Sequence, residues 1–285
     1  MQIRLSKKIG FCFGVKRAVA MAEAALKSKK VRIYSLGSII HNNEVVEDLS
    51  RKGLEVIKDI GGIRGGVVII SSHGLSPKIT GRISARGNKV IDTTCPFVSK
   101  AQSIARRLGE EGYRIVIVGD AAHPEIKALV DFVPHRAGAK TVFVAKDTSE
   151  ARAIRLGHRD RVGVISQTTQ STDNFLDVVK MVAEKRPLEL RVFNTICNDA
   201  SERQVLARAL AKAVDLMLII GGKNSANTRR LFEVCKKVLK DSYLVEKDKD
   251  LKKGWFNKKR LVGITSGAST PEWIIKEVVN KIKIQ

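Results

Sequence analysis

The sequence has few aromatic residues, few cysteines and no long hydrophobic run. Aromatic residues make up 5% of the 285 residues, and the four cysteines lie far apart. A secreted domain held by disulfides would carry more cysteines in a shorter chain, so this class is excluded. No run of about 18 uncharged apolar residues occurs, and charges interrupt the N-terminal segment too often for a signal peptide. These absences predict a cytoplasmic protein that does not span a membrane.

Acidic residues are also scarce relative to basic ones. The chain has 52 Lys and Arg against 29 Asp and Glu, a net charge of +23. Such a surface attracts anions, so one interpretation is a basic nucleic-acid-binding protein with a structural Cys/His metal site. The basic residues are scattered, however, and few aromatic side chains are available to stack on bases. Nucleic acid is therefore not the expected partner, and most of this charge is expected on solvated helix faces.

A threefold internal repeat organises the chain. Each unit begins with a strand-like stretch that leads into a cysteine and is followed by apolar residues at helical spacing. The three cysteines are Cys12, Cys95 and Cys197. In the third unit the helical pattern consists of Val205, Ala209, Leu210 and Ala213. A second apolar run ends in a glycine 25, 24 and 24 residues after the cysteine, at Gly37, Gly119 and Gly221.

The alternation of strands and helices predicts an α/β fold with mainly parallel sheets. We expect three similar α/β lobes, residues 12–94, 95–192 and 193–285, with the N-terminal strand 1–11 added to the third. The repeat predicts pseudo-threefold symmetry around one central metal cluster, because ligands bind beyond the carboxyl ends of such strands. In two loops there, Ser76 before Pro77 and Thr270 before Pro271 are expected to cap helices.

The cysteines of the repeat are candidate metal ligands. Each lies at a strand-to-helix junction, where a helix N-terminus stabilises the thiolate that binds metal. Cys235 has no counterpart in the other units and lies in an apolar helical pattern, so it is expected in the core. The residues alone leave two centres open. One is an iron–sulfur cluster with three thiolates and one open iron, and the other is zinc bound by three cysteines and a histidine.

Eight short motifs extend this pattern over nearly the whole chain. They are GFCFGVKRA at Cys12, HNNEVV at His41, SSHGLS at His73, DTTCPFV at Cys95, AHPE at His123, SQTT at Thr168, KNSANT at Ser225 and SGAST at Ser269. In this order and spacing they resemble the 4-hydroxy-3-methylbut-2-enyl diphosphate reductase family. The resemblance implies three α/β lobes around a central cluster. It also implies the last step of the non-mevalonate isoprenoid route, in which (E)-4-hydroxy-3-methylbut-2-enyl diphosphate is reductively dehydroxylated to isopentenyl and dimethylallyl diphosphates.

The same resemblance implies the cofactor and the catalytic residues. Cys12, Cys95 and Cys197 would hold one [4Fe-4S] cluster with one open iron, and a [3Fe-4S] form is expected after oxidation. Glu125 would donate a proton, with Thr168 and His123 as a relay, because hydroxide is a poor leaving group and must depart as water.

The resemblance further implies how the allylic diphosphate substrate is bound. The residues concerned are His41, His73, His123, Thr168, Ser225, Ala226, Asn227 and Ser269. Position 226 departs from the family, which commonly has serine there. Ala226 still offers its backbone N–H, so only a small effect on affinity is expected. The implied electron donor is a carrier such as ferredoxin or flavodoxin, whose acidic surface a basic protein would complement.

Overall fold

The computed structural model describes residues 1–27, 31–134 and 141–284. Its strands form three four-stranded sheets in which neighbouring strands are parallel. The first sheet contains β2 (Ile33–Leu36), β3 (Leu54–Ile57), β4 (Val67–Ile70) and β5 (Lys89–Asp92), and the second contains β6 (Arg114–Val118), β7 (Val142–Ala145), β8 (Arg161–Ser166) and β9 (Glu189–Val192). The third contains β1 (Gln2–Leu5), β10 (Leu216–Ile220), β11 (Ser242–Val245) and β12 (Leu261–Ser266).

The three sheets share one topology. Read from the strand that precedes each cysteine, the orders are β5-β4-β2-β3, β9-β8-β6-β7 and β1-β12-β10-β11. The glycine directly after the third strand in each order makes the same backbone bond. Its N–H donates at 2.9 Å to the last residue of the neighbouring edge strand, as seen at Gly37 to Ile57, Gly119 to Ala145 and Gly221 to Val245. The predicted α/β fold of three similar parallel-sheet lobes is therefore confirmed, whereas their arrangement around a cluster stays a prediction.

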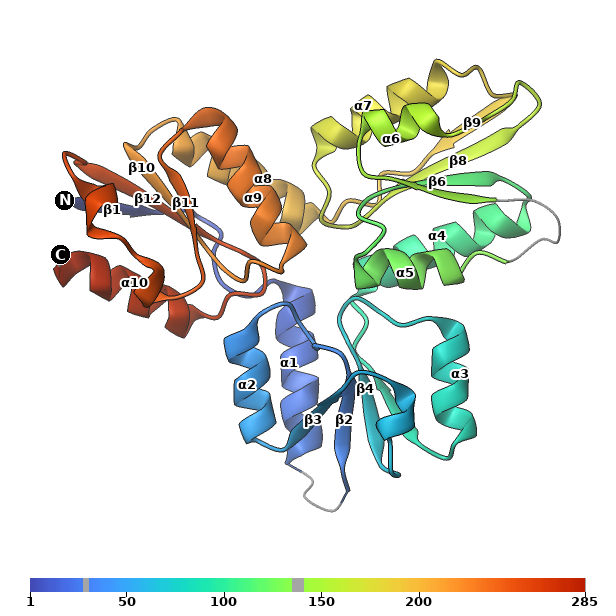
Figure 1. The fold of residues 1–285 in the computed structure, drawn as a ribbon, viewed down its shortest axis with the longest axis horizontal. Coiled ribbons are helices and arrows are strands. Elements are labelled where there is room, and N and C mark those ends of the chain that lie inside the picture. The colour runs from blue at the N-terminus through green and yellow to red at the C-terminus, as the bar shows by residue number, and fades with distance from the viewer. Residues whose placement is uncertain (28–30, 135–140, 285) are drawn as a thin grey trace. The chain divides into compact units, whose positions relative to one another are not determined.

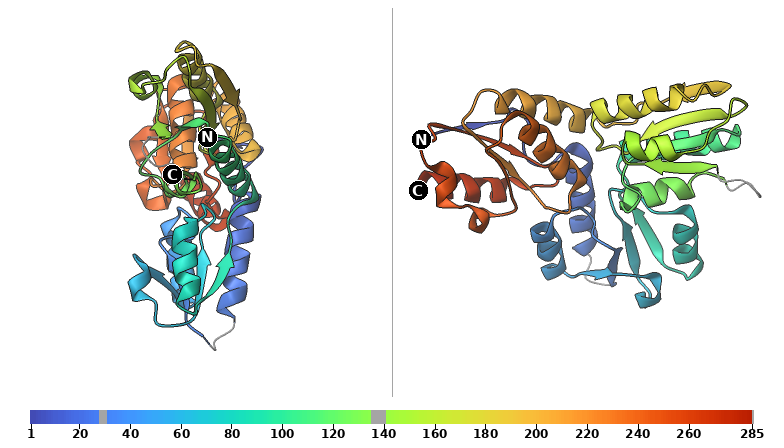
Figure 2. Two further views of the ribbon diagram at one scale, coloured as in Figure 1. Left: turned by 90° about the vertical axis from the view of Figure 1, so that its right-hand side faces the viewer. Right: turned by 45° about the horizontal axis from the view of Figure 1, so that its top comes forward.

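Helices connect these strands (Figures 1 and 2). The α-helices are α1 (Phe13–Leu26), α2 (Asn43–Arg51), α3 (Pro77–Ala85), α4 (Pro96–Glu110), α5 (Pro124–Asp131), α6 (Thr148–Ala153), α7 (Thr172–Ala183), α8 (Asn198–Ala211), α9 (Ala226–Val238) and α10 (Glu272–Ile284). Three short 3-10 helices are η1 (Ile60–Gly62), η2 (Asp248–Asp250) and η3 (Lys253–Phe256). None of the helices in the described ranges is long and apolar enough to cross a membrane.

The second and third sheets are each buried on both faces. On the second sheet, α4 and α5 pack on one face and α6 and α7 on the other, each with its own apolar cluster. On the third, α8 and α9 cover one face and α10 the other. A strand buried on both faces needs a continuous apolar run. The sequence LMLII of β10, with all five residues buried, has this property.

Contacts divide the chain into two compact units. The first consists of Met1–Arg17, Ile40–Arg51 and Asn198–Gln285, and the second of Ala18–Ile39 and Lys52–Cys197. The first unit holds the third sheet, where β1 pairs with β12, and also α2. The second unit holds the other two sheets. The lobe boundaries 12–94, 95–192 and 193–285 stay a prediction.

Two local predictions are wrong. In α8 the apolar residues at helical spacing do not all face the core, because Val205 is 64% exposed whereas Arg203 is buried. The Arg203 guanidinium is satisfied there by Asp199 Oδ2 at 2.7 Å and the Ser266 carbonyl at 3.3 Å. The cap predicted at Thr270 also fails, because α10 begins at Glu272 and the Thr270 hydroxyl donates to the Ile220 carbonyl at 3.0 Å. Ser76 does lie at the N-cap of α3 with Pro77 as the first helical residue, as predicted, although its hydroxyl makes no capping bond.

Candidate functional site

The three cysteines of the repeat are held in the same way. Each N–H donates to a carbonyl just beyond the strand next to the one that leads into the cysteine. The bonds are Cys12 to Ala268 at 3.0 Å, Cys95 to Ser72 at 3.0 Å and Cys197 to Thr168 at 2.8 Å. All three are partly exposed and lie at the start of α1, α4 and α8. Cys12 belongs to the first unit and the other two to the second.

Cys235 differs from these three cysteines. Its side chain is fully buried in the cluster beneath α8 and α9, and burial raises the pKa of its thiol to about 12. A thiol in such a place is inert, so the prediction that Cys235 is a core residue is confirmed. By contrast, Cys12 Sγ accepts a hydrogen bond from the Val15 N–H at 3.4 Å, in the first turn of α1. That position favours a thiolate.

The second unit contains a buried carboxyl group on α5. Glu125 is 1% exposed. The N–H of Thr168 donates to its Oε1 at 2.6 Å, and the Thr168 hydroxyl donates to its Oε2 at 2.8 Å. Burial raises the pKa of Glu125 to about 7 in spite of these two bonds. A carboxylic acid that is half protonated near neutral pH can both give and take a proton.

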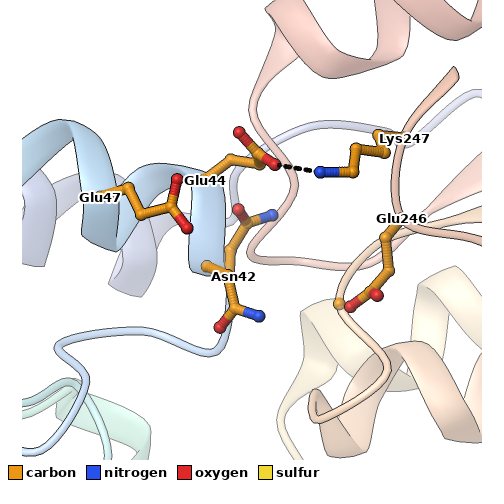
Figure 3. Close-up of a pocket in the computed structure, with 7 residues that line it drawn as sticks. Asn42, Glu44, Glu47, Glu246 and Lys247 are labelled. Atoms are coloured by element: carbon orange, nitrogen blue, oxygen red, sulfur yellow. Dashed lines mark hydrogen bonds and ion pairs between the residues drawn. The ribbon is translucent and has the colours of Figure 1, made fainter. Parts of the chain in front are cut away.

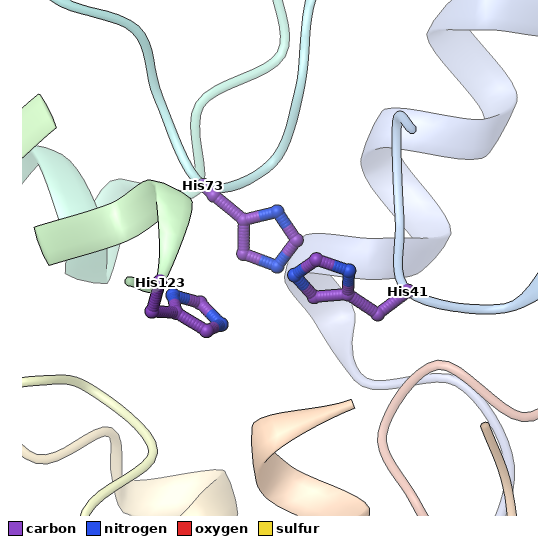
Figure 4. A group of neighbouring side chains, drawn as sticks. All are labelled: His41, His73 and His123. Atoms are coloured by element: carbon purple, nitrogen blue, oxygen red, sulfur yellow. The ribbon is translucent and has the colours of Figure 1, made fainter. Parts of the chain in front are cut away.

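Two histidines lie in the same unit as Glu125. His123 is the N-cap of α5, and its Nδ1 accepts the Glu125 N–H at 3.2 Å, which leaves Nε2 to carry the proton. The ring of His73, from the loop after β4, meets the ring of His123 edge to face with centroids 5.4 Å apart (Figure 4). The structure therefore brings Glu125, Thr168, His123 and His73 into one unit, with direct contacts from Thr168 to Glu125 and from His123 to both Glu125 and His73.

The first unit gathers the other predicted substrate ligands. Ser225 caps α9, accepting the Thr228 N–H at 3.3 Å, and Ala226 is the first residue of that helix. Asn227 follows and is 5% exposed, yet neither its amide oxygen nor its amide nitrogen has a partner. Because a buried amide without hydrogen bonds is costly, such a group indicates a ligand that completes it. Free N–H groups at a helix N-terminus favour an anionic one.

Two contacts to the backbone carbonyl of His41 hold this residue near the start of α9. The Ser269 hydroxyl donates to the His41 carbonyl at 3.1 Å. Gly222 also approaches this carbonyl, because a Cβ atom on Gly222 would lie only 2.8 Å from the oxygen. Burial, together with the charge of Arg229, lowers the pKa of His41, so its ring is mostly neutral at neutral pH. Sequence reasoning missed Gly222, although the Gly221-Gly222 pair at a repeat landmark was a usable signal.

A cavity of about 110 Å³ opens near the start of α2 in the first unit. Its lining includes Glu44, Glu47, Glu246 and Lys247 (Figure 3). The Lys247 ammonium pairs with Glu44 at 3.1 Å. Three carboxylates against one lysine would repel a diphosphate, so this cavity is not a candidate for the anionic substrate.

Comparison with known proteins gives one consistent result. Residues 3–283 match the family model described as LytB protein. A 4-hydroxy-3-methylbut-2-enyl diphosphate reductase of Geobacter metallireducens is 44% identical over 284 residues, covering 99% of this chain and 97% of that protein. The corresponding proteins of Geobacter sulfurreducens and Campylobacter hominis are 45% and 43% identical, over 99% of this chain and 97% and 98% of theirs.

Two solved structures are also similar. One, described as the E-1-hydroxy-2-methyl-but-2-enyl-4-diphosphate reductase from Plasmodium falciparum, aligns with a TM-score of 0.91 at 26% identity, over 98% of this chain and 87% of that one. The other is described as (E)-4-hydroxy-3-methyl-but-2-enyl diphosphate reductase, the terminal enzyme of the non-mevalonate pathway. It aligns with a TM-score of 0.69 at 39% identity, over 100% of this chain and 99% of that one.

Proposed function

This chain belongs to the LytB protein family, and we propose that it reduces (E)-4-hydroxy-3-methylbut-2-enyl diphosphate to isopentenyl and dimethylallyl diphosphates. The reaction consumes two electrons and two protons, breaks the allylic C–O bond, forms a C–H bond and releases water. The observation that carries the proposal is Glu125, a fully buried acid with a pKa near neutrality and a threonine hydroxyl on it. A location in the cytoplasm is part of the proposal.

We assign Cys12, Cys95 and Cys197 as ligands of one [4Fe-4S] cluster. Their partial exposure, their helix-start positions and their shared backbone bond support this assignment over a core role. When bound, the cluster supplies the electrons and one iron without a protein ligand, which acts as a Lewis acid on the substrate hydroxyl. Zinc on the same thiolates would fit the ligand chemistry but provides no electrons for the reduction.

Glu125 is the proton donor in this account. Near neutral pH about half of the Glu125 side chains are protonated, since the pKa of Glu125 is about 7. The Thr168 hydroxyl, 2.8 Å from the carboxyl oxygen, can pass that proton to the leaving hydroxyl, which then departs as water. His123 completes the relay. Because its Nδ1 accepts the Glu125 N–H, the proton on Nε2 is the one that it can donate.

The diphosphate is assigned to the polar groups at helix starts. In the first unit these are the Asn227 amide, the Ser225 hydroxyl, the Ala226 N–H at the start of α9, and His41 with Ser269. The unpartnered Asn227 amide supports this assignment most directly. His73, His123 and Thr168 of the second unit complete the proposed set of substrate ligands.

The function is tested by anaerobic turnover with substrate and chemically reduced methyl viologen. The wild type should form the two five-carbon diphosphates. Glu125→Gln should keep the cluster and the fold but lose roughly 100-fold or more in turnover, the usual scale for a general acid. Glu184→Gln, which changes an exposed glutamate at the end of α7, is the matched control and should behave as wild type. Wild-type turnover by Glu125→Gln would remove Glu125 from the mechanism.

A further inference from the structure

We propose that a face of the first unit formed by Phe13, Lys16, Trp273 and Lys276 docks an acidic protein that carries one electron at a time. This face is called the docking face below. The inference rests on the proposed function, because only a reductase whose cluster is bound in part by Cys12 needs an electron donor at this place.

The docking face adjoins the loop that carries Cys12. Cys12 is followed directly by α1, whose first residue is Phe13. On the other side of the loop, a Cβ atom on Gly10 would lie 3.6 Å from Glu272 Cγ, at the first residue of α10. The Cys12 N–H also donates to the Ala268 carbonyl in the loop that leads to α10. Two helices therefore begin beside this cysteine, and each has an aromatic residue at its first or second position.

Both aromatic side chains are exposed to solvent. Phe13 is 66% exposed and Trp273 is 45% exposed. In the described ranges the only other aromatic side chain classed as exposed is Phe97, so two of these three flank one short loop. Exposed aromatic groups contribute little to folding but are enriched in protein interfaces, where their burial provides much of the binding energy.

Charge determines which partner this face fits. Residues 1–17 contain five Lys and Arg and no acidic residue. Lys16 and Lys276, both exposed, lie one helical turn after Phe13 and Trp273. The exposed acids nearby on α10 are Glu272 and Glu277. With a net charge of +23 on the whole chain, an acidic carrier would be steered to the surface and held weakly, as befits a partner that must leave after each transfer.

The electron count of the reaction is compatible with a carrier that delivers one electron each time it docks. Each docking oxidises the carrier by one electron and reduces the enzyme by one. Two dockings and two protons from the medium reduce one substrate molecule, with loss of one water. A short path from the carrier to a thiolate ligand favours fast transfer, and the docking face adjoins the loop of such a ligand.

The test compares two electron donors on anaerobic holoenzyme, an acidic [2Fe-2S] ferredoxin and reduced methyl viologen, and measures binding of the oxidised ferredoxin by calorimetry. Phe13→Ser and Trp273→Ser should each lower kcat/KM for ferredoxin and weaken its binding by about 10-fold, with viologen turnover unchanged. Lys16→Glu with Lys276→Glu should weaken binding more at low salt than at high salt.

The controls carry the same changes elsewhere. Leu188→Ser alters a side chain that is 70% exposed on the second unit, and Lys252→Glu with Lys258→Glu makes the same charge change on other exposed lysines. Both should bind ferredoxin as the wild type does. The inference is wrong if Trp273→Ser binds and uses ferredoxin normally, if the controls lose as much, or if viologen turnover falls equally. A wild type that fails with viologen as well would instead overturn the proposed function.

Discussion

The sharpest consequence of the buried Glu125 is a dependence of catalysis on pH. With a pKa of about 7, the protonated fraction of this carboxyl falls from roughly 90% near pH 6 to roughly 1% near pH 9. If Glu125 must give a proton in the transition state, its contribution to kcat/KM falls in proportion, by roughly 100-fold over that range. An ordinary surface glutamate would be fully ionised throughout and would produce no such decrease.

The assay is anaerobic turnover with reduced methyl viologen, which keeps the carrier protein out of the measurement. The substrate diphosphate titrates in the same range. Glu125→Gln leaves the diphosphate unchanged and loses only the carboxyl. The ratio of the wild-type kcat/KM to that of Glu125→Gln therefore isolates Glu125. We expect this ratio to fall with rising pH, with a midpoint near 7. A ratio that stays constant from about pH 6 to about pH 9 would refute the reasoning.

Four further predictions concern single side chains. Folding raises the pKa of Glu125 from 4.5 to about 7. Its contribution to stability is therefore fully present below pH 4.5 and is lost as pH rises through 7. Relative to Glu125→Gln, the free energy of unfolding in denaturant should fall by about 3 kcal/mol over this range. Cys95→Ala should lose iron and sulfide on anaerobic analysis, whereas Cys235→Ala should retain both. Asn227→Ala should raise the substrate KM by about 10- to 100-fold without lowering the melting temperature, since it removes an amide unpaired in the free protein. Gly163→Ala should destabilise the fold by about 1–3 kcal/mol in denaturant unfolding, because its Cβ would lie 2.7 Å from Leu108 Cδ1.

The repeat made most of the fold predictable. Three cysteine-to-glycine spacings of nearly equal length indicated three copies of one α/β unit, and the structure has three sheets with one strand order. Short continuous apolar runs such as those of β6 and β10 favour strands buried on both faces, because they are shorter than an ordinary helix.

The parts that escaped prediction depend on contacts between distant residues. The edge strands β3, β7 and β11 are four residues long and only partly buried, so they lack a clear periodic signal. The burial of Arg203 depends on a carbonyl 63 positions further along the chain. Likewise, the Gly221-Gly222 pair marks a close approach but does not show that the His41 carbonyl is the group that lies against Gly222.

The candidate site divides in the same way. The resemblance to the reductase family pointed to Ser225, Ala226 and Asn227, and these residues do lie at the start of α9. The raised pKa of Glu125 was not predictable, because it arises from complete burial under the loop that carries Thr168. The inert character of Cys235 was predictable, because the apolar helical pattern around it placed it in the core.

The most direct test of the central claim is the metal and sulfide content of the wild-type protein, purified and reconstituted without oxygen. If three thiolates bind one [4Fe-4S] cluster, the protein should be brown and contain about four iron atoms and four sulfide ions per chain. A colourless protein that contains about one zinc ion per chain and no sulfide would contradict the account, because zinc at those cysteines cannot deliver the electrons on which the reaction depends.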